Sequence, residues 1–140
     1  MTISADDRAA VFDLLAMHGH LIDAGELDRL GEILTCDAIY DVTSLGAPAL
    51  EGIDAIREAA LTLGAGNPVG HLVTNTVLSE APDGSIRARS KGLGVNADGT
   101  AGTVTYLDTV VRTGEGWRIG YREVIAHSSP LGGKGGGAAR

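Results

Sequence analysis

Four residues stand out because their side chains can move protons or bind anions: His18, Asp23, His71 and Arg122. His71 leads the stretch "GHLVTNTVLSE", residues 70 to 80, which alternates apolar and polar side chains like a strand with one buried face. A neutral imidazole can take a proton near neutral pH, and a neighbouring carboxylate would fix its tautomer and make it a stronger base. His71 is therefore a candidate general base that needs an acidic partner.

His18 shares a helical stripe with Val11, Leu14, Leu15 and Ile22, so its side chain is expected to point inward. An inward histidine is either a core side chain satisfied by one hydrogen bond or a polar group at a site. Two imidazoles in the stretch "HGH" would project about 200° apart around a helix, which makes a poor chelate. No metal site is predicted.

Asp23 and Arg122 each allow two interpretations. Asp23 follows "HLI" near the expected helix end, where an aspartate commonly forms a turn or caps the next helix, and periodicity alone does not aim it at a pocket. Arg122 lies in "WRIGYREVIAH", in phase with Gly120 and Val124, an otherwise small and apolar set. A guanidinium there forms a salt bridge at the sheet surface or faces an anion or a developing negative charge.

One face of the predicted strand over 85–96 carries only small residues, which indicates a pocket. Ser90, Gly92 and Gly94 lie there at positions where large side chains would normally fill a core. Glycines in a strand also mark sheet curvature, and both interpretations can hold. If the phase of His71 is the inner one, Asn75 lies on the same wall. With the aromatic residues that are available to line a pocket, the predicted substrate-binding residues are Tyr40, Asn75, Tyr106 and Trp117.

The composition excludes several classes of partner. The length of 140 residues suits one domain, and a net charge of −7 without a cluster of Lys and Arg argues against nucleic acid and anionic membranes. One cysteine, Cys36, cannot build a disulfide framework, and no apolar run approaches the ~20 residues of a membrane helix. A cytoplasmic protein that acts on a small molecule is expected.

Periodicity predicts helices first and strands afterwards. The expected elements are a helix over residues 5 to 22, a short helix marked by Leu27, Leu30, Ile33 and Leu34, a strand over 38–44, a helix marked by Ile53, Ile56, Ala60 and Leu63, and strands over 71–80, 85–96, 101–112 and 117–127. This order indicates the α+β class with a curved antiparallel sheet packed on helices. The domain is expected to span 1–130, followed by a disordered Gly-rich tail over 131–140.

The order of these elements, together with "HGHLIDAGELDRLGEIL" and "GHLVTN", resembles the SnoaL-like branch of the nuclear-transport-factor-two-like superfamily over residues from about 6 to 130. Within it, the sequence resembles the group of scytalone dehydratase, lindane dehydrochlorinase and bile acid 7α-dehydratase. The resemblance implies a cone-shaped α+β barrel, in which a mixed or antiparallel sheet and three helices enclose an apolar pocket.

The same resemblance implies a dyad of Asp23 and His71, and a pocket-facing arginine at Arg122. The family has a Tyr or Lys five residues before the aspartate, where this sequence has His18. The implied mechanism is proton abstraction at carbon by His71, oriented by Asp23, with His18 and Arg122 stabilising the leaving group or an enolate-like charge. No cofactor is required.

The expected function is a cofactor-independent lyase, similar to a dehydratase or dehydrohalogenase, that acts on a small to mid-sized apolar substrate. An isomerase or cyclase of a polyketide, steroid or terpenoid would use the same groups. A module that binds a ligand without turnover is the alternative from another class. The resemblance also implies a homodimer or homotrimer formed through the open sheet face.

Overall fold

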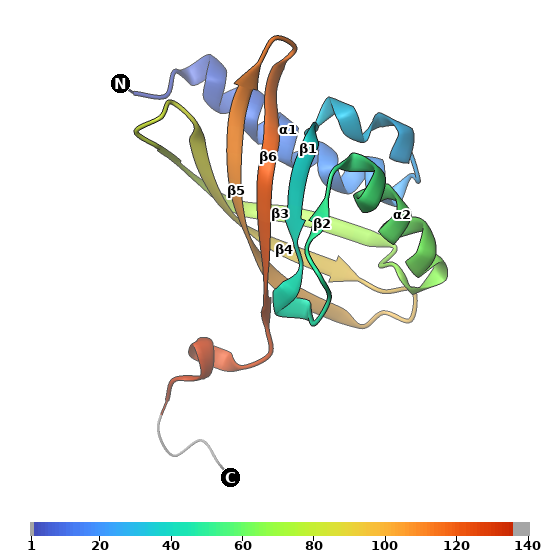
Figure 1. Cartoon of the computed structure of the whole chain (residues 1–140). Helices are drawn as coiled ribbons and strands as arrows, with labels where there is room; N and C mark the ends of the chain where they lie inside the picture. Colours follow the sequence, from blue (N-terminus) through green and yellow to red (C-terminus); the bar gives the residue numbers. More distant parts are fainter. Residues whose placement is uncertain (1, 136–140) are drawn as a thin grey trace.

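The computed structural model describes residues 2–135 of the chain (Figure 1). Its elements follow the predicted order, except that a two-residue strand, β2, and short 3-10 helices that were not predicted are added. They are α1 (Ala5–Asp23), the 3-10 helix η1 (Leu27–Glu32), β1 (Leu34–Asp41), η2 (Thr43–Leu45), β2 (Leu50–Glu51), α2 (Ile53–Leu63), η3 (Gly64–Gly66), β3 (Gly70–Glu80), β4 (Ile86–Val95), β5 (Ala101–Thr113), β6 (Gly116–His127) and η4 (Pro130–Gly133).

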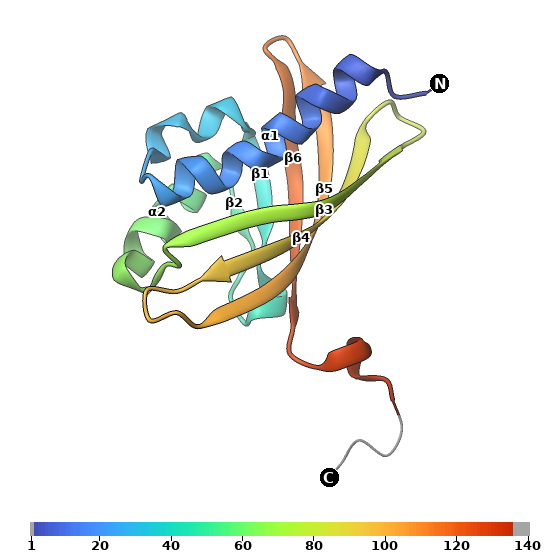
Figure 2. The ribbon, with the colours of Figure 1, turned by 180° about the vertical axis from the view of Figure 1, so that it is seen from behind.

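The six strands form one curled, mixed sheet in the order β2-β1-β6-β5-β4-β3. β1 runs parallel to β6, and all other neighbours are antiparallel. α1 lies across the sheet over β3, and α2 and η1 cover the side of β1 and β2 (Figures 1 and 2). The predicted α+β cone, a curved sheet packed on three helices, is confirmed.

The first helix begins and ends as its sequence predicts. Ser4 caps it, because the Ser4 Oγ accepts a hydrogen bond of 3.1 Å from the backbone N–H of Asp7. The helix ends at Asp23, two residues before Gly25, whose φ of +69° takes the chain out of the helical conformation. Of the predicted inward stripe, Val11, Leu14, Leu15 and His18 are buried and Ile22 is half-buried.

The segment between the first two helices and the sheet departs from the prediction. The second helix ends at Glu32 and is a 3-10 helix, and the strand expected over 38–44 instead spans 34–41. Leu34 pairs with Ile119 of β6, 85 positions further along the chain. Because this parallel partner is remote in sequence, local periodicity does not reveal that the strand starts at Leu34.

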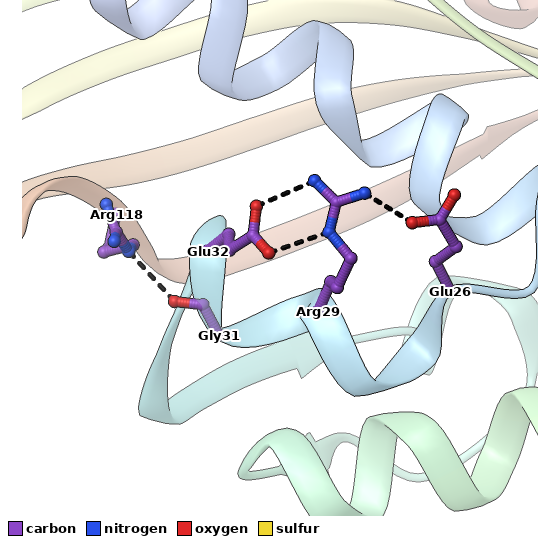
Figure 3. A network of polar contacts seen from close by, with 5 residues as sticks. All are labelled: Glu26, Arg29, Gly31, Glu32 and Arg118. Atoms are coloured by element: carbon purple, nitrogen blue, oxygen red, sulfur yellow. Dashed lines mark hydrogen bonds and ion pairs between the residues drawn. The ribbon is translucent and has the colours of Figure 1, made fainter.

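An exposed polar network holds η1 in place (Figure 3). Arg29 donates from Nε to Glu32 Oε2 at 2.8 Å and also contacts Glu26. Arg118 of β6 donates from Nε to the carbonyl oxygen of Gly31 at 3.0 Å. Exposed ion pairs stabilise little by themselves. The bond from Arg118 to the η1 backbone joins η1 to β6, together with the bond of 2.8 Å from the backbone N–H of Ile119 to the carbonyl oxygen of Ile33, at the end of η1.

The outer face of the sheet carries exposed apolar side chains, namely Leu72, Val77, Leu93 and Tyr121. Association of subunits through this face stays a prediction. Among the described residues, no helix is long and apolar enough to cross a membrane.

The C-terminal segment leads away from the sheet in Figure 1 and contains η4, with Leu131 80% exposed. The predicted disorder of the tail concerns residues 131–140, of which 136–140 lie outside the described residues. The boundary between domain and tail therefore stays a prediction.

Candidate functional site

A cavity of about 590 Å³ lies between the inner face of the sheet and the helices, a volume typical of small-molecule sites. It holds four of the predicted site residues, His18, Tyr40, His71 and Tyr106. These form its polar end, because the ring of His18 has its centre 5.9 to 6.3 Å from the centres of the other three rings. The remaining wall is mostly aliphatic and includes Ile22, Leu30, Val42, Leu45, Leu50, Ile56, Leu63, Val104 and Val124.

Asp23 and His71 form the contact that the resemblance implies. Asp23 Oδ1 lies 2.6 Å from His71 Nδ1, and Asp23 Oδ2 accepts the backbone N–H of His71 at 3.0 Å. Because a carboxylate only accepts hydrogen bonds, Nδ1 carries the proton of the neutral imidazole and Nε2 keeps its lone pair. His71 lines the cavity, so Nε2 is the basic atom that this side chain can present to a ligand.

Gly19 makes this contact possible and was not predicted as a site residue. A Cβ atom on Gly19 would lie 2.2 Å from the carbonyl oxygen of His71, far inside any real contact. Only a glycine lets α1 approach the β3 backbone so closely, and Asp23, one helical turn later, then reaches His71. A signal was present in the sequence, since a glycine inside a helix costs about 1 kcal/mol relative to Ala and needs a structural reason.

His18 points into the polar end, as predicted, and is only 4% exposed. Its Nε2 lies 3.5 Å from the hydroxyl of Tyr40, and its buried Nδ1 has no partner among the described residues. Burial, followed by the positive charge of Arg122 and then the neighbouring His71, lowers the pKa of His18 well below its ordinary value. His18 is therefore neutral at pH 7. It can donate a hydrogen bond to a ligand or accept one from it, but it carries no positive charge.

Arg122 is buried, but it does not line the cavity as the resemblance implied. It donates from Nε and Nη2 to the two carboxylate oxygens of Asp108, at 2.6 and 2.9 Å. Its guanidinium carbon lies 4.2 Å from the ring centre of Tyr106, which does line the cavity. Arg122 therefore lies behind Tyr106, a correction to its predicted placement.

A β-bulge accounts for this placement and for the missed residue, Asp108. Val110 of β5 pairs with Ile119 of β6, and Thr109 pairs with Tyr121. Gly120 lies between these two partners and is therefore the extra residue of the bulge. The extra residue brings Arg122 opposite Asp108, and both side chains face inward. Without it, the register would put Arg122 against a different residue of β5 and turn its side chain to the outer face.

Two predicted substrate-binding residues lie outside the cavity. Asn75 is exposed and has a left-handed φ of +56°, within the register shift of β3 between Thr74 and Val77. This bulge ends the alternation that placed Asn75 on the wall of His71. Trp117 lies at the start of β6, away from the cavity, and its Nε1 donates a hydrogen bond of 3.0 Å to Asp7 Oδ1.

The small residues of β4 leave space, as the sequence suggested, and the ring of Tyr106 fills part of that space. A Cβ on Gly92 would lie 2.4 Å from the ring of Tyr106, so the missing side chain makes room for that ring. Ser90 is buried and its Oγ lies 2.9 Å from the hydroxyl of Thr76. Gly94 lines the cavity itself.

The site offers hydrogen bonds and imidazole groups rather than fixed charges. His127, which was not predicted as a site residue, also lines the cavity, and its Nε2 lies 2.7 Å from the Oγ1 atom of Thr105. No Lys, Arg, Asp or Glu lines the cavity among the described residues. Over the same part of the chain, no three His, Cys, Asp or Glu side chains group in a way that could hold a metal ion. The arrangement can bind an uncharged organic molecule and move a proton to or from it.

The curled mixed sheet, the enclosed cavity and the acid–base pair at its polar end define a protein of the nuclear-transport-factor-two-like fold. A sequence model of the SnoaL-like domain matches residues 4–123, so the chain belongs to the SnoaL-like family. Among curated proteins, none matches the chain significantly.

Solved structures share this fold. A candidate aromatic ring hydroxylase from Novosphingobium aromaticivorans is 28% identical, with 91% of this chain and 94% of that chain covered and a TM-score of 0.73. ActVI-ORFA from Streptomyces coelicolor is 21% identical over 85% of this chain and 96% of its own, with a TM-score of 0.70. A protein with a cystatin-like fold from Nostoc punctiforme is 17% identical, with 94% of this chain and 99% of that chain covered and a TM-score of 0.77. The last two similarities concern the fold alone.

Proposed function

We propose that this protein is a cofactor-independent enzyme that moves a proton at a carbon atom of an uncharged, mainly apolar substrate, as in a double-bond isomerisation or a ring closure. The observation that carries the proposal is the Asp23–His71 pair at the polar end of an apolar cavity. His71 Nε2 takes the proton, while Asp23 holds the required tautomer and stabilises the imidazolium. The SnoaL-like family includes cofactor-independent polyketide cyclases and isomerases, which agrees with this chemistry.

The cavity wall supports the substrate class. Aliphatic side chains dominate it, and no charged residue lines it among those described. An ionised group that enters such a space without a partner loses its hydration without compensation, which costs several kcal/mol. A small to mid-sized neutral molecule, with one oxygen function at the polar end, fits these surroundings best.

Loss of water is the second candidate, because a protonated His71 can return its proton to a leaving hydroxyl group. Loss of a halide receives less support. Apart from the imidazolium formed at His71, the described residues place no cation beside a departing halide, because Arg122 is bound to Asp108 behind Tyr106 and His18 is neutral. The dehydratase form of the expected lyase thus remains a candidate, and the dehydrohalogenase form is disfavoured.

Deuterium exchange tests the proposal without knowledge of the natural substrate. The protein is incubated in D₂O with 2-tetralone, an uncharged ketone with exchangeable α-protons, and incorporation is followed by mass spectrometry. We expect the wild-type protein to accelerate exchange, and His71→Ala to reduce the acceleration about 100-fold or more. Asp23→Asn should reduce it at least about tenfold, because the amide does not hold the same tautomer.

The matched control is Asp7→Asn, which makes the same change in charge at the other end of α1 and should leave exchange unchanged. A folded His71→Ala protein that exchanges at the wild-type rate would falsify the mechanism. If the wild-type protein binds 2-tetralone without any acceleration, the alternative of a non-catalytic binding module is correct instead.

A further inference from the structure

The wall behind the polar end contains three contacting side chains, Asp108, Arg122 and Tyr106, which we call the pocket stack. The side chains of Arg122 and Asp108 are 1% and 0% exposed and share two hydrogen bonds. The ring of Tyr106 lies directly over the guanidinium, at 4.2 Å. Asp108 of β5 pairs with Arg122 of β6, and Tyr106 lies two residues before Asp108 on β5, so the sheet itself fixes their arrangement.

Stability alone does not explain this buried pair. Removing two charges from water is costly, and apolar residues of similar size at such positions are often neutral or stabilising. In addition, the Nη1 atom of Arg122 is buried without a hydrogen-bond partner among the described residues. A buried donor left unpaired in a native protein requires an explanation, and a functional role is one.

Tyr106 connects the pair to the cavity. Gly92 leaves the space that its ring occupies, since a Cβ there would lie 2.4 Å away. Burial, followed by the neighbouring Tyr40, raises the pKa of Tyr106 above its ordinary value. Arg122 acts in the opposite direction, and the smaller effect of Asp108 offsets part of that of Arg122. The phenol therefore stays protonated at neutral pH and can donate a hydrogen bond. A cation against the ring face stabilises electron density that moves onto the phenol oxygen, which strengthens that donor.

We propose that Arg122 and Asp108 are positioning residues that act through Tyr106, whose hydroxyl binds a substrate oxygen on which negative charge develops when His71 removes a proton. This inference rests on the proposed function. His71 Nε2 takes the proton from carbon, and the electron pair of the C–H bond moves to the carbonyl oxygen. Tyr106 keeps its proton and donates a hydrogen bond to that oxygen. When the pair returns to carbon, His71 gives the proton back at the same or another carbon.

The probe for this role is 4-nitrophenol, which resembles an enol and ionises near neutral pH. Its phenolate absorbs visible light, so the ionisation state of the bound probe is read directly. At a pH where the free probe is mainly neutral, we expect the wild-type protein to bind it as the phenolate. Tyr106→Phe should weaken phenolate binding about tenfold or more. Binding of 4-nitroanisole, which has no acidic proton, should not change.

The pair itself is tested with the double substitution Asp108→Leu/Arg122→Met, which removes both charges and leaves none unpaired. We expect it to fold and to shift the bound probe from phenolate to phenol, with at least a tenfold loss of phenolate affinity and unchanged binding of 4-nitroanisole. Arg112→Met is the matched control, because Arg112 also lies over an aromatic ring and pairs with an aspartate, but on the surface.

The outcomes separate this inference from the function on which it rests. If phenolate binding is lost in His71→Ala but unchanged in the double variant, the role of the pair is wrong and the proposed function stands. If the wild-type protein binds 4-nitrophenol only as the neutral phenol, both are wrong.

Discussion

The pocket stack has a counterpart at the other end of the sheet, the hairpin stack of Asp7, Arg112 and Trp117. There, Arg112 donates from Nη2 to Asp7 Oδ1 at 2.8 Å, and its guanidinium carbon lies 4.4 Å from the ring centre of Trp117. The chemical groups and distances nearly repeat those of the pocket stack. One arginine comes from each strand of the β5–β6 hairpin.

Burial separates the two stacks. The arginine and aspartate side chains are 59% and 29% exposed in the hairpin stack, against 1% and 0% in the pocket stack. Water and salt screen the first pair, so it fastens the start of α1 to the hairpin without contributing much free energy. The second pair has no access to water, so each of its charges depends on the other. Similar contacts thus attach a helix end to the sheet at one end and form a buried ion pair behind the cavity at the other.

The largest expected effect follows from breaking the pocket stack on one side. Arg122→Ala leaves the carboxylate of Asp108 buried without its partner, and we expect a loss of about 3–5 kcal/mol in the free energy of unfolding. Denaturant unfolding measures it. The double variant Asp108→Leu/Arg122→Met should stay much closer to the wild-type value. If Arg122→Ala costs no more than Arg112→Ala, burial does not distinguish the two stacks.

Gly19→Ala should have the next largest effect on stability, because Gly19 lies against the backbone of His71 at the cavity. A methyl group 2.2 Å from the His71 carbonyl oxygen must push α1 away from β3. We expect a loss of about 1–3 kcal/mol by denaturant unfolding and slower deuterium exchange, because Asp23 moves away from His71. Gly31→Ala is the control, since Gly31 is also helical and a Cβ there would lie 3.9 Å from its nearest neighbour, the Cδ1 atom of Ile53. Wild-type exchange in Gly19→Ala would contradict the role of this close approach.

The pH dependence of stability should report His18, which is buried beside the pocket stack. Burial lowers the pKa of His18 in the folded state, so below about pH 6.5 the unfolded chain binds a proton that the folded protein does not. The free energy of unfolding should therefore fall with decreasing pH by up to ~1.4 kcal/mol per unit. Denaturant unfolding between pH 7.5 and 5 measures this slope. His18→Gln should reduce it, and an unchanged slope would show that His18 is not its source.

The smallest effect is expected at the hairpin stack. Arg112→Met should lower the thermal midpoint only slightly, and the difference from wild type should shrink in high salt. Hydrogen bonds from Trp117, then Arg112, lower the pKa of Asp7, so its contribution persists at neutral pH and disappears only as the pH falls through the lowered value. If Arg112→Met lost as much stability as Arg122→Ala, and did so regardless of salt, the two stacks would not differ as described.

Prediction from sequence succeeded where a signal lies within one element. The 3.6-residue stripe of α1 and the turn residues between β3, β4, β5 and β6 placed these elements within one or two residues of their observed bounds. The stripe also placed His18 inward. The pairing of Asp23 with His71 came from family resemblance, because periodicity does not indicate where the side chain at a helix end points.

The sequence by itself determined the α+β class, the order of elements and the residues able to move a proton. The tertiary structure decided which of them meet. A single extra residue at Gly120 reverses the phase of β6 and brings Arg122 to Asp108, and the bulge at Asn75 turns that side chain to solvent. Such shifts depend on pairing between strands that are distant in sequence, so no pattern within one strand specifies them. The approach of α1 to β3 at Gly19 is likewise a property of the packed fold.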